Sequence, residues 1–536
     1  MGRRRKPDRT GSIGGNLNAL EPRLRIWALL AGIALATPAC TTLGPDYQEP
    51  TTQWLADWQP DLYGQLQEPT SEVESDIARW WTRFEDPALN ALVVSALKEN
   101  PGIQAAGLRV LEARAQLSGA SALRLPQVQT FDASAAYLRQ RRSDGLLPAS
   151  DDSLGSYSAS LGIGWELDFW GRFQRSIEAA DAVYLSSVAN QRDAQVILVA
   201  QVADLYYAYR TTEKRIAIAN ENAAIQERSF SITTQLFESG QESELDLQQA
   251  KTQYLATLAT IPDLERSRTQ LRNALAVLLG RPPVPLPELA TSIESLPTVE
   301  PAALTAIPAN LVLRRPDVRS SAWLTGAQSA QIGIAEADLY PAISLGGSFG
   351  WAGDSISATR DGTTFAVGPG IRWNIFDWGL IRSNIRVQDA RLQQALAAYD
   401  ATVLQAAREI DDAAIAVAKT AEAQEILTES REAAERALEI ANRRYREGYA
   451  DFQRVLDAQR ALFSQAEKEL VNQGAHLSAV VALYKSIGGG WESQSTEQML
   501  PAEVLETMRE RTNWGDLLEV DVPVDLENAN SEGSNP

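Results

Sequence analysis

Four segments of the chain alternate between apolar residues and small or polar ones. The clearest begins at Tyr157, after which apolar side chains occupy the odd positions through Phe169 and Ser, Gly, Glu or Asp occupy the even ones. Similar alternation covers 343–351 and 365–375, and a less regular one covers 127–137. A period of two over about ten residues is typical of a β-strand with one buried face. We therefore predict four strands, arranged as two pairs.

Helical patterns fill most of the remaining sequence. Segments of about 88–122 and 317–338 each end shortly before a proline, as helices tend to do. The tracts 172–239 and 380–447 contain no glycine or proline and are rich in Ala, Leu, Gln, Glu and Arg. As continuous helices, each would reach about 100 Å. A compact domain does not need helices of that length, and each is followed by a turn and a returning helix.

The same order of signals occurs twice along the chain. As far as Pro126 the two copies align at an offset of 215 residues, and from Trp165 onward they align at an offset of 208. The aligned pairs are Pro101 and Pro316, Pro126 and Pro341, Trp165 and Trp373, Trp170 and Trp378, Gly240 and Gly448, and Gly280 and Gly488. Because chance does not hold a register over such a distance, we predict two copies of one structural unit.

The N-terminal residues have the pattern of an export signal. Basic residues precede the apolar stretch 26–36, and small residues then lead to Cys40. The sequence Thr37-Pro38-Ala39-Cys40 is similar to a bacterial lipoprotein cleavage box, in which the cysteine becomes the lipidated N-terminus. We expect residues 1–39 to be removed. Their seven bases and two acids leave with them, so the formal net charge changes from −20 to −25.

The composition excludes several kinds of site. One cysteine, one histidine and three methionines leave no disulfide framework, no Cys/His zinc site and no Cys–His dyad. The histidine, His476, lies in no catalytic motif, so we expect no enzyme and no metal or cofactor. The excess of 69 acids over 49 bases repels nucleic acid, whose binding depends on neutralised phosphates. No run of 18 apolar residues predicts a spanning helix.

The long helical tracts alone would also fit a soluble antiparallel coiled coil. The strands favour another interpretation, because apolar faces that end in aromatic residues are typical of a membrane-spanning β-barrel wall. A lipid-exposed barrel must close to satisfy its edges. The smallest such barrels have about eight strands, whereas one chain supplies only four. We therefore expect the protein to be an oligomer.

Several longer blocks carry a family resemblance. They are Gly44-Pro45-Asp46-Tyr47, Trp80-Trp81 with Asp86-Pro87, Leu313–Arg319, Phe376-Asp377-Trp378-Gly379, Val455–Arg460 and Gly488-Gly489-Gly490-Trp491. With these blocks, which span about 44–491, the chain resembles the TolC family of outer-membrane efflux proteins. It is most similar to the OprM-like (NodT-type) lipoprotein branch. Ala322, where the family often has Glu, is a departure.

The resemblance implies a fold that is mainly α with a small β part. In this family, three copies build a homotrimeric twelve-stranded β-barrel in the outer membrane, continuous with a long periplasmic α-helical barrel. The trimer is a passive exit duct for drugs or other small molecules. Its implied partners are a periplasmic adaptor (membrane fusion) protein, an inner-membrane RND-type transporter and outer-membrane lipid.

The resemblance also suggests a gate. In the family, the helix that starts near Gly448 constricts the tunnel at its periplasmic tip, and Asp457 matches an acidic gate position. Three such acids around an axis repel one another and attract cations. Arg454, where some relatives have a second acid, favours a gate of mixed charge near Tyr449, and an ordinary solvated Asp/Arg pair is the alternative. The turns at Gly240 and Gly448 are expected adaptor contacts, or simply helix C-caps.

Other functions stay open at this point. Within the family, the duct could serve type I protein secretion or metal efflux, although the lipoprotein signal and the Arg-Arg-Pro-Asp block favour drug efflux. Outside the family, the rivals are an exported carboxylate-dependent hydrolase and a soluble helical scaffold. The predicted parts of the chain are a signal peptide (1–39), an N-terminal extended segment (40–85), repeat 1 (86–280), a Pro-rich linker (281–300), repeat 2 (301–488) and an acidic C-terminal tail (489–536).

Overall fold

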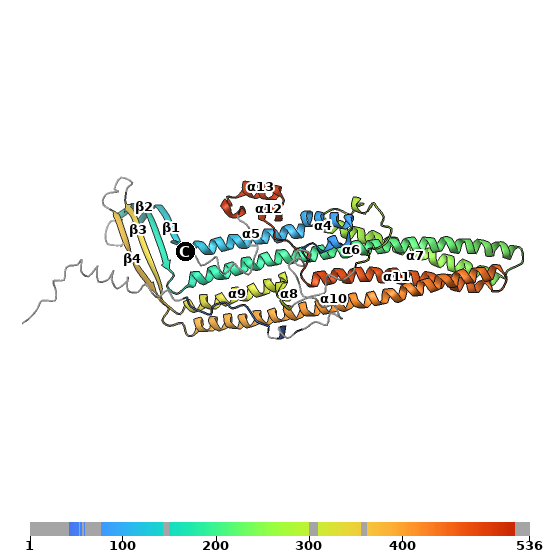
Figure 1. The fold of residues 1–536 in the computed structure, drawn as a ribbon. Helices are drawn as coiled ribbons and strands as arrows, with labels where there is room; N and C mark the ends of the chain where they lie inside the picture. Colours follow the sequence, from blue (N-terminus) through green and yellow to red (C-terminus); the bar gives the residue numbers. More distant parts are fainter. Residues whose placement is uncertain are drawn as a thin grey trace, which may run out of the picture. The chain divides into compact units, whose positions relative to one another are not determined.

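The fold is mainly helical, with one four-stranded antiparallel sheet (Figure 1). The computed structural model describes residues 42–52, 54–55, 58, 77–142, 150–299, 309–354 and 362–519. The predicted signal peptide and Cys40 lie outside these residues. The chain divides into two compact units, one of 1–44, 123–175 and 333–383, which includes the sheet, and one of the remaining residues. Among the described helices, none combines the length and the apolar character that a membrane crossing requires.

The sheet contains the four predicted strands. They are β1 (Val128–Arg142), β2 (Ser150–Leu167), β3 (Ala342–Gly353) and β4 (Thr363–Arg372), in the order β1-β2-β3-β4. The alternation suggested strands through Phe169 and Ile375, but β2 and β4 end earlier. After β4 the backbone leaves the ladder to start the next helix, where Asp377 accepts the N–H groups of Gly379 at 3.1 Å and Ile381 at 2.8 Å.

The pairing register separates an apolar face of the sheet from a polar one. Phe131 lies opposite Leu161, Leu161 opposite Phe349, and Phe349 opposite Phe365, so one apolar row crosses all four strands. These side chains are exposed by 69%, 55%, 53% and 73% in that order. The opposite face carries mainly Ser, Gly, Ala and Thr. The faces therefore match the pattern from which the strands were predicted.

Each copy places shorter helices before its strands. In the first copy these are α4 (Pro87–Glu99) and α5 (Pro101–Ala122), and in the second α8 (Ala309–Arg314) and α9 (Pro316–Ala337). The single helix expected over 88–122 is interrupted at Asn100. This residue precedes a proline, which disfavours the helical conformation, and its backbone is extended at φ −67° and ψ 122°.

The two long helical predictions are confirmed. They are α6 (Arg172–Glu238) and α10 (Leu380–Arg446), and each is followed by a returning helix, α7 (Glu244–Leu278) or α11 (Phe452–Ser486). The intervening turns use Gly240 and Gly448 with φ of 72° and 76°, the left-handed conformation that ends many helices. Helix α11 starts at Phe452, four residues after Gly448.

Two of the blocks that carry the family resemblance, Trp80-Trp81 and Asp86-Pro87, form part of the core. The short helix η1 (Trp80–Phe84) buries Trp80 completely, and its indole stacks on Tyr484 with ring centroids 5.0 Å apart. Asp86 caps α4 by accepting the N–H of Ala88 at 2.9 Å. The same carboxylate accepts the hydroxyl of Tyr206 at 2.6 Å. The blocks Trp80-Trp81 and Asp86-Pro87 therefore join η1, α4, α6 and α11.

The block around Tyr47 lies along α9. Its ring packs on Gly326, where a Cβ would come within 3.2 Å of the ring. Its hydroxyl donates to the backbone oxygen of Ala322 at 2.9 Å, and its ring centroid lies 6.1 Å from that of Trp323. Tyr47, which precedes the first copy in the sequence, is thus fixed to the second copy.

The segment expected as an acidic tail from 489 onward contains folded structure as far as residue 519. The linker between the copies contains the 3-10 turn η2 (Pro287–Leu289). The C-terminal elements are α12 (Thr496–Met499), α13 (Ala502–Arg511) and η4 (Gly515–Leu518). They join a buried apolar cluster with α5, α6 and α9. Its members include Met499, Leu505, Met508, Leu518, Val110, Leu111, Val188 and Trp323.

Candidate functional site

The turns that join the long helices to the returning helices form the candidate site. A Cβ added at Gly240 or Gly448 would have nothing within 4 Å. Glycine is therefore needed there for its positive φ alone, and both turns are open to a partner. In the second turn the side chain of Tyr449 is 81% exposed. Asp451 then caps α11 by accepting the N–H of Arg454 at 3.3 Å.

Asp457 lies on the exposed side of α11, nearly two turns beyond this cap. Its carboxylate forms an ion pair with Arg460 at 3.1 Å, and Gln453 donates to it at 3.0 Å. Arg454 is also exposed, and no ion pair of its side chain is found in the described part of the chain. An acid that precedes its base along a helix pairs better than the reverse order. The base beside Asp457 is thus Arg460, and not Arg454 as the sequence suggested.

The end of the long helices that carries the turns at Gly240 and Gly448 is called the tip. Three hydrogen bonds near the tip connect the second copy to the first. The hydroxyl of Tyr445 donates to Glu242 at 3.0 Å, across the two turns. Burial, followed by this bond to Glu242, raises the pKa of Tyr445 to about 12. Further along α11, Arg460 donates to Gln253 of α7 at 3.0 Å, and Gln459 donates to Ser229 of α6 at the same distance.

A small apolar cluster supports these bonds. Its buried members are Ala250, Phe452, Val455 and Leu456, and Phe230, Leu438, Ala441 and Tyr445 pack against it. The sequence blocks contained the stretch Val455–Arg460, but nothing in them identified the partners on the first copy. The tip is therefore a closed contact between both copies, with Asp457 on its outer surface.

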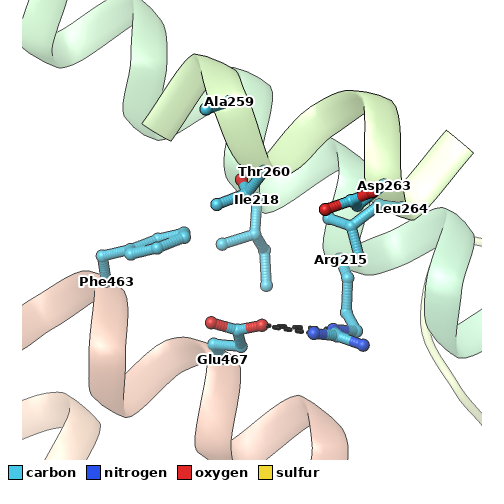
Figure 2. Close-up of a pocket in the computed structure, with 8 residues that line it drawn as sticks. All are labelled: Arg215, Ile218, Ala259, Thr260, Asp263, Leu264, Phe463 and Glu467. Atoms are coloured by element: carbon cyan, nitrogen blue, oxygen red, sulfur yellow. Dashed lines mark hydrogen bonds and ion pairs between the residues drawn. The ribbon is translucent and has the colours of Figure 1, made fainter. Parts of the chain in front are cut away.

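A cavity of about 280 Å³ lies further up the helices, between α6, α7 and α11 (Figure 2). It lies beside Pro262, a proline inside α7, and prolines in helix interiors remove a backbone bond and bend the helix. Its acids are both paired, Glu467 with Arg215 at 2.6 Å and Asp263 with Arg266 at 3.0 Å. The cavity therefore offers no free pair of carboxylates for the hydrolase that the sequence left open.

The remaining chemical candidates have structural partners. Nδ1 of His476, the single histidine, lies 2.9 Å from the hydroxyl of Thr420, a contact between α11 and α10. In the part of the chain that the structure describes, no group of three or more His, Cys, Asp and Glu side chains is arranged to hold a metal ion.

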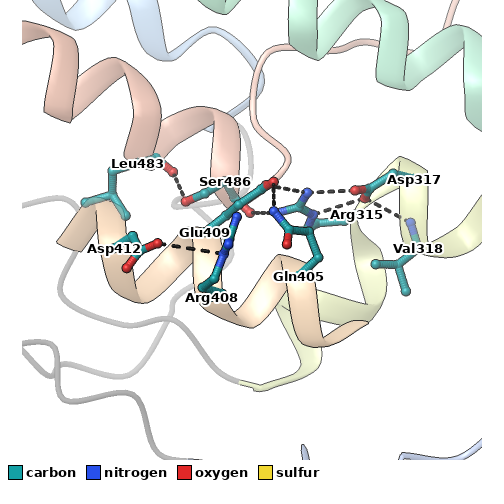
Figure 3. A network of polar contacts seen from close by, with 9 residues as sticks. All are labelled: Arg315, Asp317, Val318, Gln405, Arg408, Glu409, Asp412, Leu483 and Ser486. Carbon is teal, nitrogen blue, oxygen red and sulfur yellow. Dashed lines mark hydrogen bonds and ion pairs between the residues drawn. The ribbon is translucent and has the colours of Figure 1, made fainter. Parts of the chain in front are cut away.

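The Arg-Arg-Pro-Asp block places the buried Arg315 at the centre of a polar network (Figure 3). The guanidinium of Arg315 donates to the backbone oxygen of Ser486 at 2.6 Å and contacts Asp317 at 2.7 Å and Glu409 at 3.0 Å. Nearby, burial and the charge of Asp317 raise the pKa of Asp193 to about 6. The network joins the start of α9 to α10 and to the end of α11, so this block is an anchor of the fold.

Comparisons with known proteins agree with this architecture. The family model described as outer membrane efflux protein matches residues 92–281 and 307–489. The probable efflux pump outer membrane protein SepC of Pseudomonas putida is 30% identical over 482 residues, which cover 88% of this chain and 98% of that protein. The solvent efflux pump outer membrane protein SrpC of Pseudomonas putida is 32% identical over 460 residues, covering 84% and 95%.

A solved structure gives the same result at the level of the fold. The outer-membrane channel OprN is 33% identical, with a TM-score of 0.73, over 84% of this chain and 99% of that one. The resemblance that the sequence blocks indicated is confirmed. The chain belongs to the outer membrane efflux protein family.

Proposed function

We propose that three copies of this chain close into one channel, which is the passive exit duct of an efflux pump. Family membership makes the chain an outer-membrane component of efflux. The trimer, its partners, its gate and its cargo are inferred beyond that. The observation that carries the proposal is the sheet, which has one apolar face, one polar face and two edges that pair with no further strand among the described residues.

The sheet cannot serve in a membrane as a single copy. Lipid satisfies no backbone hydrogen bonds, and β1 and β4 each pair with one strand only among the described residues. Copies joined edge to edge would place the apolar row through Phe131 and Phe365 toward lipid and the Ser- and Gly-rich face toward water. Two copies give eight strands, whose interior is filled by side chains. Three copies give twelve and leave room for a duct.

Two neighbouring residues of β3 test this arrangement. Phe349 belongs to the apolar face and Ser348 to the polar face. Phe349→Arg places a charge toward lipid, at a cost of about 2–4 kcal/mol per copy, and the protein should be lost from the outer-membrane fraction. Ser348→Arg places the same charge toward water, so the variant should assemble and change the conductance in planar bilayers. Equal assembly of both variants, or a wild-type protein without conductance, would exclude the channel.

The cargo is proposed to be small organic molecules, including drugs. The names of SrpC and SepC describe a solvent efflux pump and a probable efflux pump. The partners are a periplasmic adaptor and an inner-membrane RND-type transporter. Export of proteins by a type I system, or of metal ions, is the second candidate. Drug susceptibility and protein export are compared in a deletion strain. If the proposal holds, drug susceptibility changes and protein export does not.

The open turns are the proposed contacts with the adaptor. Ser239 beside Gly240 and Tyr449 beside Gly448 are both exposed, so Ser239→Cys and Tyr449→Cys provide sites for a thiol-reactive cross-linker in cells. Both variants should capture the same periplasmic protein. Ser121→Cys, an exposed position at the end of α5, is the control and should capture none. Equal capture at all three positions would remove the turns from the adaptor contact.

The tip is the proposed gate, with Asp457 and its partner Arg460 on the surface and Arg454 and Tyr449 nearby. Asp457→Ala should change single-channel conductance and reduce block by multivalent cations. The matched control is Asp263→Ala, since Asp263 also forms an exposed i,i+3 pair with an arginine, Arg266. If both variants conduct as the wild type does, Asp457 does not belong to the gate.

The proposed lipid anchor is Cys40, which lies outside the described residues. Cells that produce the wild-type protein should incorporate labelled fatty acid into it, and the Cys40→Ser variant should not be labelled. Labelling of the variant would place the acyl chain elsewhere.

A further inference from the structure

The two copies repeat individual side-chain contacts at the end of the sheet that adjoins the long helices. The indole N–H of Trp165 donates to the backbone oxygen of Arg124 at 3.2 Å. The aligned Trp373 donates to the backbone oxygen of Leu339 at 2.9 Å. Arg124 and Leu339 each lie two residues before the aligned prolines. The repeat therefore extends from the sequence to single hydrogen bonds.

A second tryptophan makes its contact in the first copy only. The ring of Trp170 stacks on Tyr340 with centroids 4.6 Å apart, and its indole N–H donates to the backbone oxygen of Pro341 at 2.9 Å. Trp378, which aligns with Trp170, is 100% exposed. Its φ is 52°, an uncommon value for a bulky residue. Trp378 is thus a large apolar side chain whose counterpart has a defined docking place.

The repeat identifies the residues that should receive Trp378. Tyr340 and Pro341 align with Leu125 and Pro126, and the side chain of Leu125 is 65% exposed. Trp170 reaches its partners because β2 lies beside β3. Leu125 and Pro126 precede β1, whereas Trp378 follows β4, and these strands form opposite edges of the sheet. Three strand spacings, about 14 Å, separate the edges, so Trp378 reaches such a site only on another copy.

We infer that β4 of one copy pairs with β1 of a second copy as β2 pairs with β3 within the chain. Trp378 then packs on Leu125 of the second copy and donates its indole N–H to the backbone oxygen of that copy's Pro126. This inference rests on the proposed channel of several copies and adds to it the contacts and the register of the subunit boundary.

The register follows from the pairing inside the chain. Gly164 lies opposite Gly346 in the β2–β3 pair. The residue that aligns with Gly164 is Arg372. The residue equivalent to Gly346 follows from the other two strand pairs. Ser160 aligns with Gly368, and Gly346 lies opposite Gly368. Asp132 lies opposite Ser160 and is therefore the equivalent of Gly346. Arg372 of one copy should therefore lie directly opposite Asp132 of the next.

Charge supports this register independently of the alignment. The side chain of Arg372 is 82% exposed and forms an ion pair with Glu166 of the same chain at 4.0 Å, and Asp132 is exposed on the same face of β1. Directly opposed residues of unlike charge stabilise an antiparallel pair. A shift of two residues would place Arg372 opposite Thr130 or Ser134, neither of which is charged.

Cysteine pairs test the boundary in the full-length protein. Directly opposed residues have Cβ atoms about 4.5–5.5 Å apart and diagonal ones are about 7–8 Å apart, and a disulfide forms only across the shorter separation. After oxidation in membranes, Arg372→Cys with Asp132→Cys should give covalent dimers and trimers, about tenfold more than two control pairs. The controls combine Arg372→Cys with Thr130→Cys or with Ser134→Cys.

A charge exchange gives a second readout. Arg372→Asp should reduce the trimer that survives mild detergent by about tenfold, because it opposes like charges at three boundaries. Adding Asp132→Arg should restore the trimer to within about twofold of the wild type. Trp378→Ala should likewise lower the trimer fraction, whereas Trp170→Ala should lower the stability of each copy.

The outcomes separate the boundary from the channel itself. Stronger cross-linking in a control pair, or no rescue by the exchanged charges, would overturn the register. Native mass spectra that show trimers, with no cross-link in any pair, would overturn the β4–β1 boundary and leave the channel in place. Native mass spectra that show only single copies would remove both.

Discussion

The two copies of the repeat build the same junction with different chemistry. In the first copy the side-chain amide of Asn100 donates to the backbone oxygen of Leu278 at 2.8 Å. In the second copy Arg315 donates to the backbone oxygen of Ser486 at 2.6 Å. Both donors precede an aligned proline, and both acceptors end a returning helix. Both copies therefore preserve a hydrogen bond from the residue before the shorter helix, α5 or α9, to the last residue of the returning helix, α7 or α11.

The second junction needs additional residues because arginine cannot accept a hydrogen bond. The oxygen of Asn100 also accepts the N–H of Gly102 at 2.7 Å and so starts α5. In the second copy Asp317 takes this role by accepting the N–H of Val318 at 2.9 Å. The neutral junction is thus complete with one side chain. The charged one recruits acids from several helices and makes them depend on Arg315.

The largest expected effect is the loss of the buried cation. Arg315→Ala removes the buried guanidinium from Asp317 and Glu409, whose side chains are 29% and 32% exposed, and each hydrogen bond to a charged group is worth about 1.5–3 kcal/mol. Asn100→Ala removes neutral hydrogen bonds and should cost about 1–2 kcal/mol. Urea unfolding in detergent, followed by circular dichroism, measures both. Equal losses would show that the charge at the second junction does not matter.

The glycines that end the returning helices should give a smaller difference. Both have positive φ, 66° at Gly280 and 74° at Gly488, so alanine costs about 1–2 kcal/mol at either position. A Cβ at Gly280 would lie 2.5 Å from the backbone oxygen of Glu99, and one at Gly488 would lie 3.3 Å from Cα of Arg315. Gly280→Ala should therefore lower the unfolding midpoint more than Gly488→Ala does. Gly448→Ala, with open space around it, is the control for φ alone.

A third expected effect is a pH dependence that only the charged junction produces. Burial and the nearby Asp317 raise the pKa of Asp193 from 3.8 to about 6. Between these pH values the folded chain holds more protons than the unfolded chain, so this residue lowers stability as pH rises from about 4 to about 6. Asp193→Asn should raise the unfolding midpoint at pH 7.5 and leave it unchanged at pH 3.5.

The exposed Asp400→Asn is the control for this measurement and should shift neither midpoint. A wild-type protein and an Asp193→Asn variant with parallel pH profiles would show that Asp193 does not respond to the junction.

The sequence predicted those parts of the fold that depend on local pattern. The ends of α6 and α10 follow from tracts without glycine or proline that stop at Gly240 and Gly448, and the sheet faces follow from alternation. The break at Asn100 was missed because one helical pattern continues through Pro101. The contacts of the tip were missed for another reason. Tyr445 and Glu242 lie about 200 residues apart, and no local pattern indicates which distant side chain completes a hydrogen bond.

The docking of Tyr47 on α9 constrains the order of events during biogenesis. Its hydroxyl binds Ala322, 275 residues further along the chain, and contacts of such long sequence separation form late. The N-terminal segment therefore has no docking place until the second repeat has crossed the inner membrane. Any processing of the N-terminus can take place while that segment is still free. The last step of folding then brings the N-terminal segment onto α9.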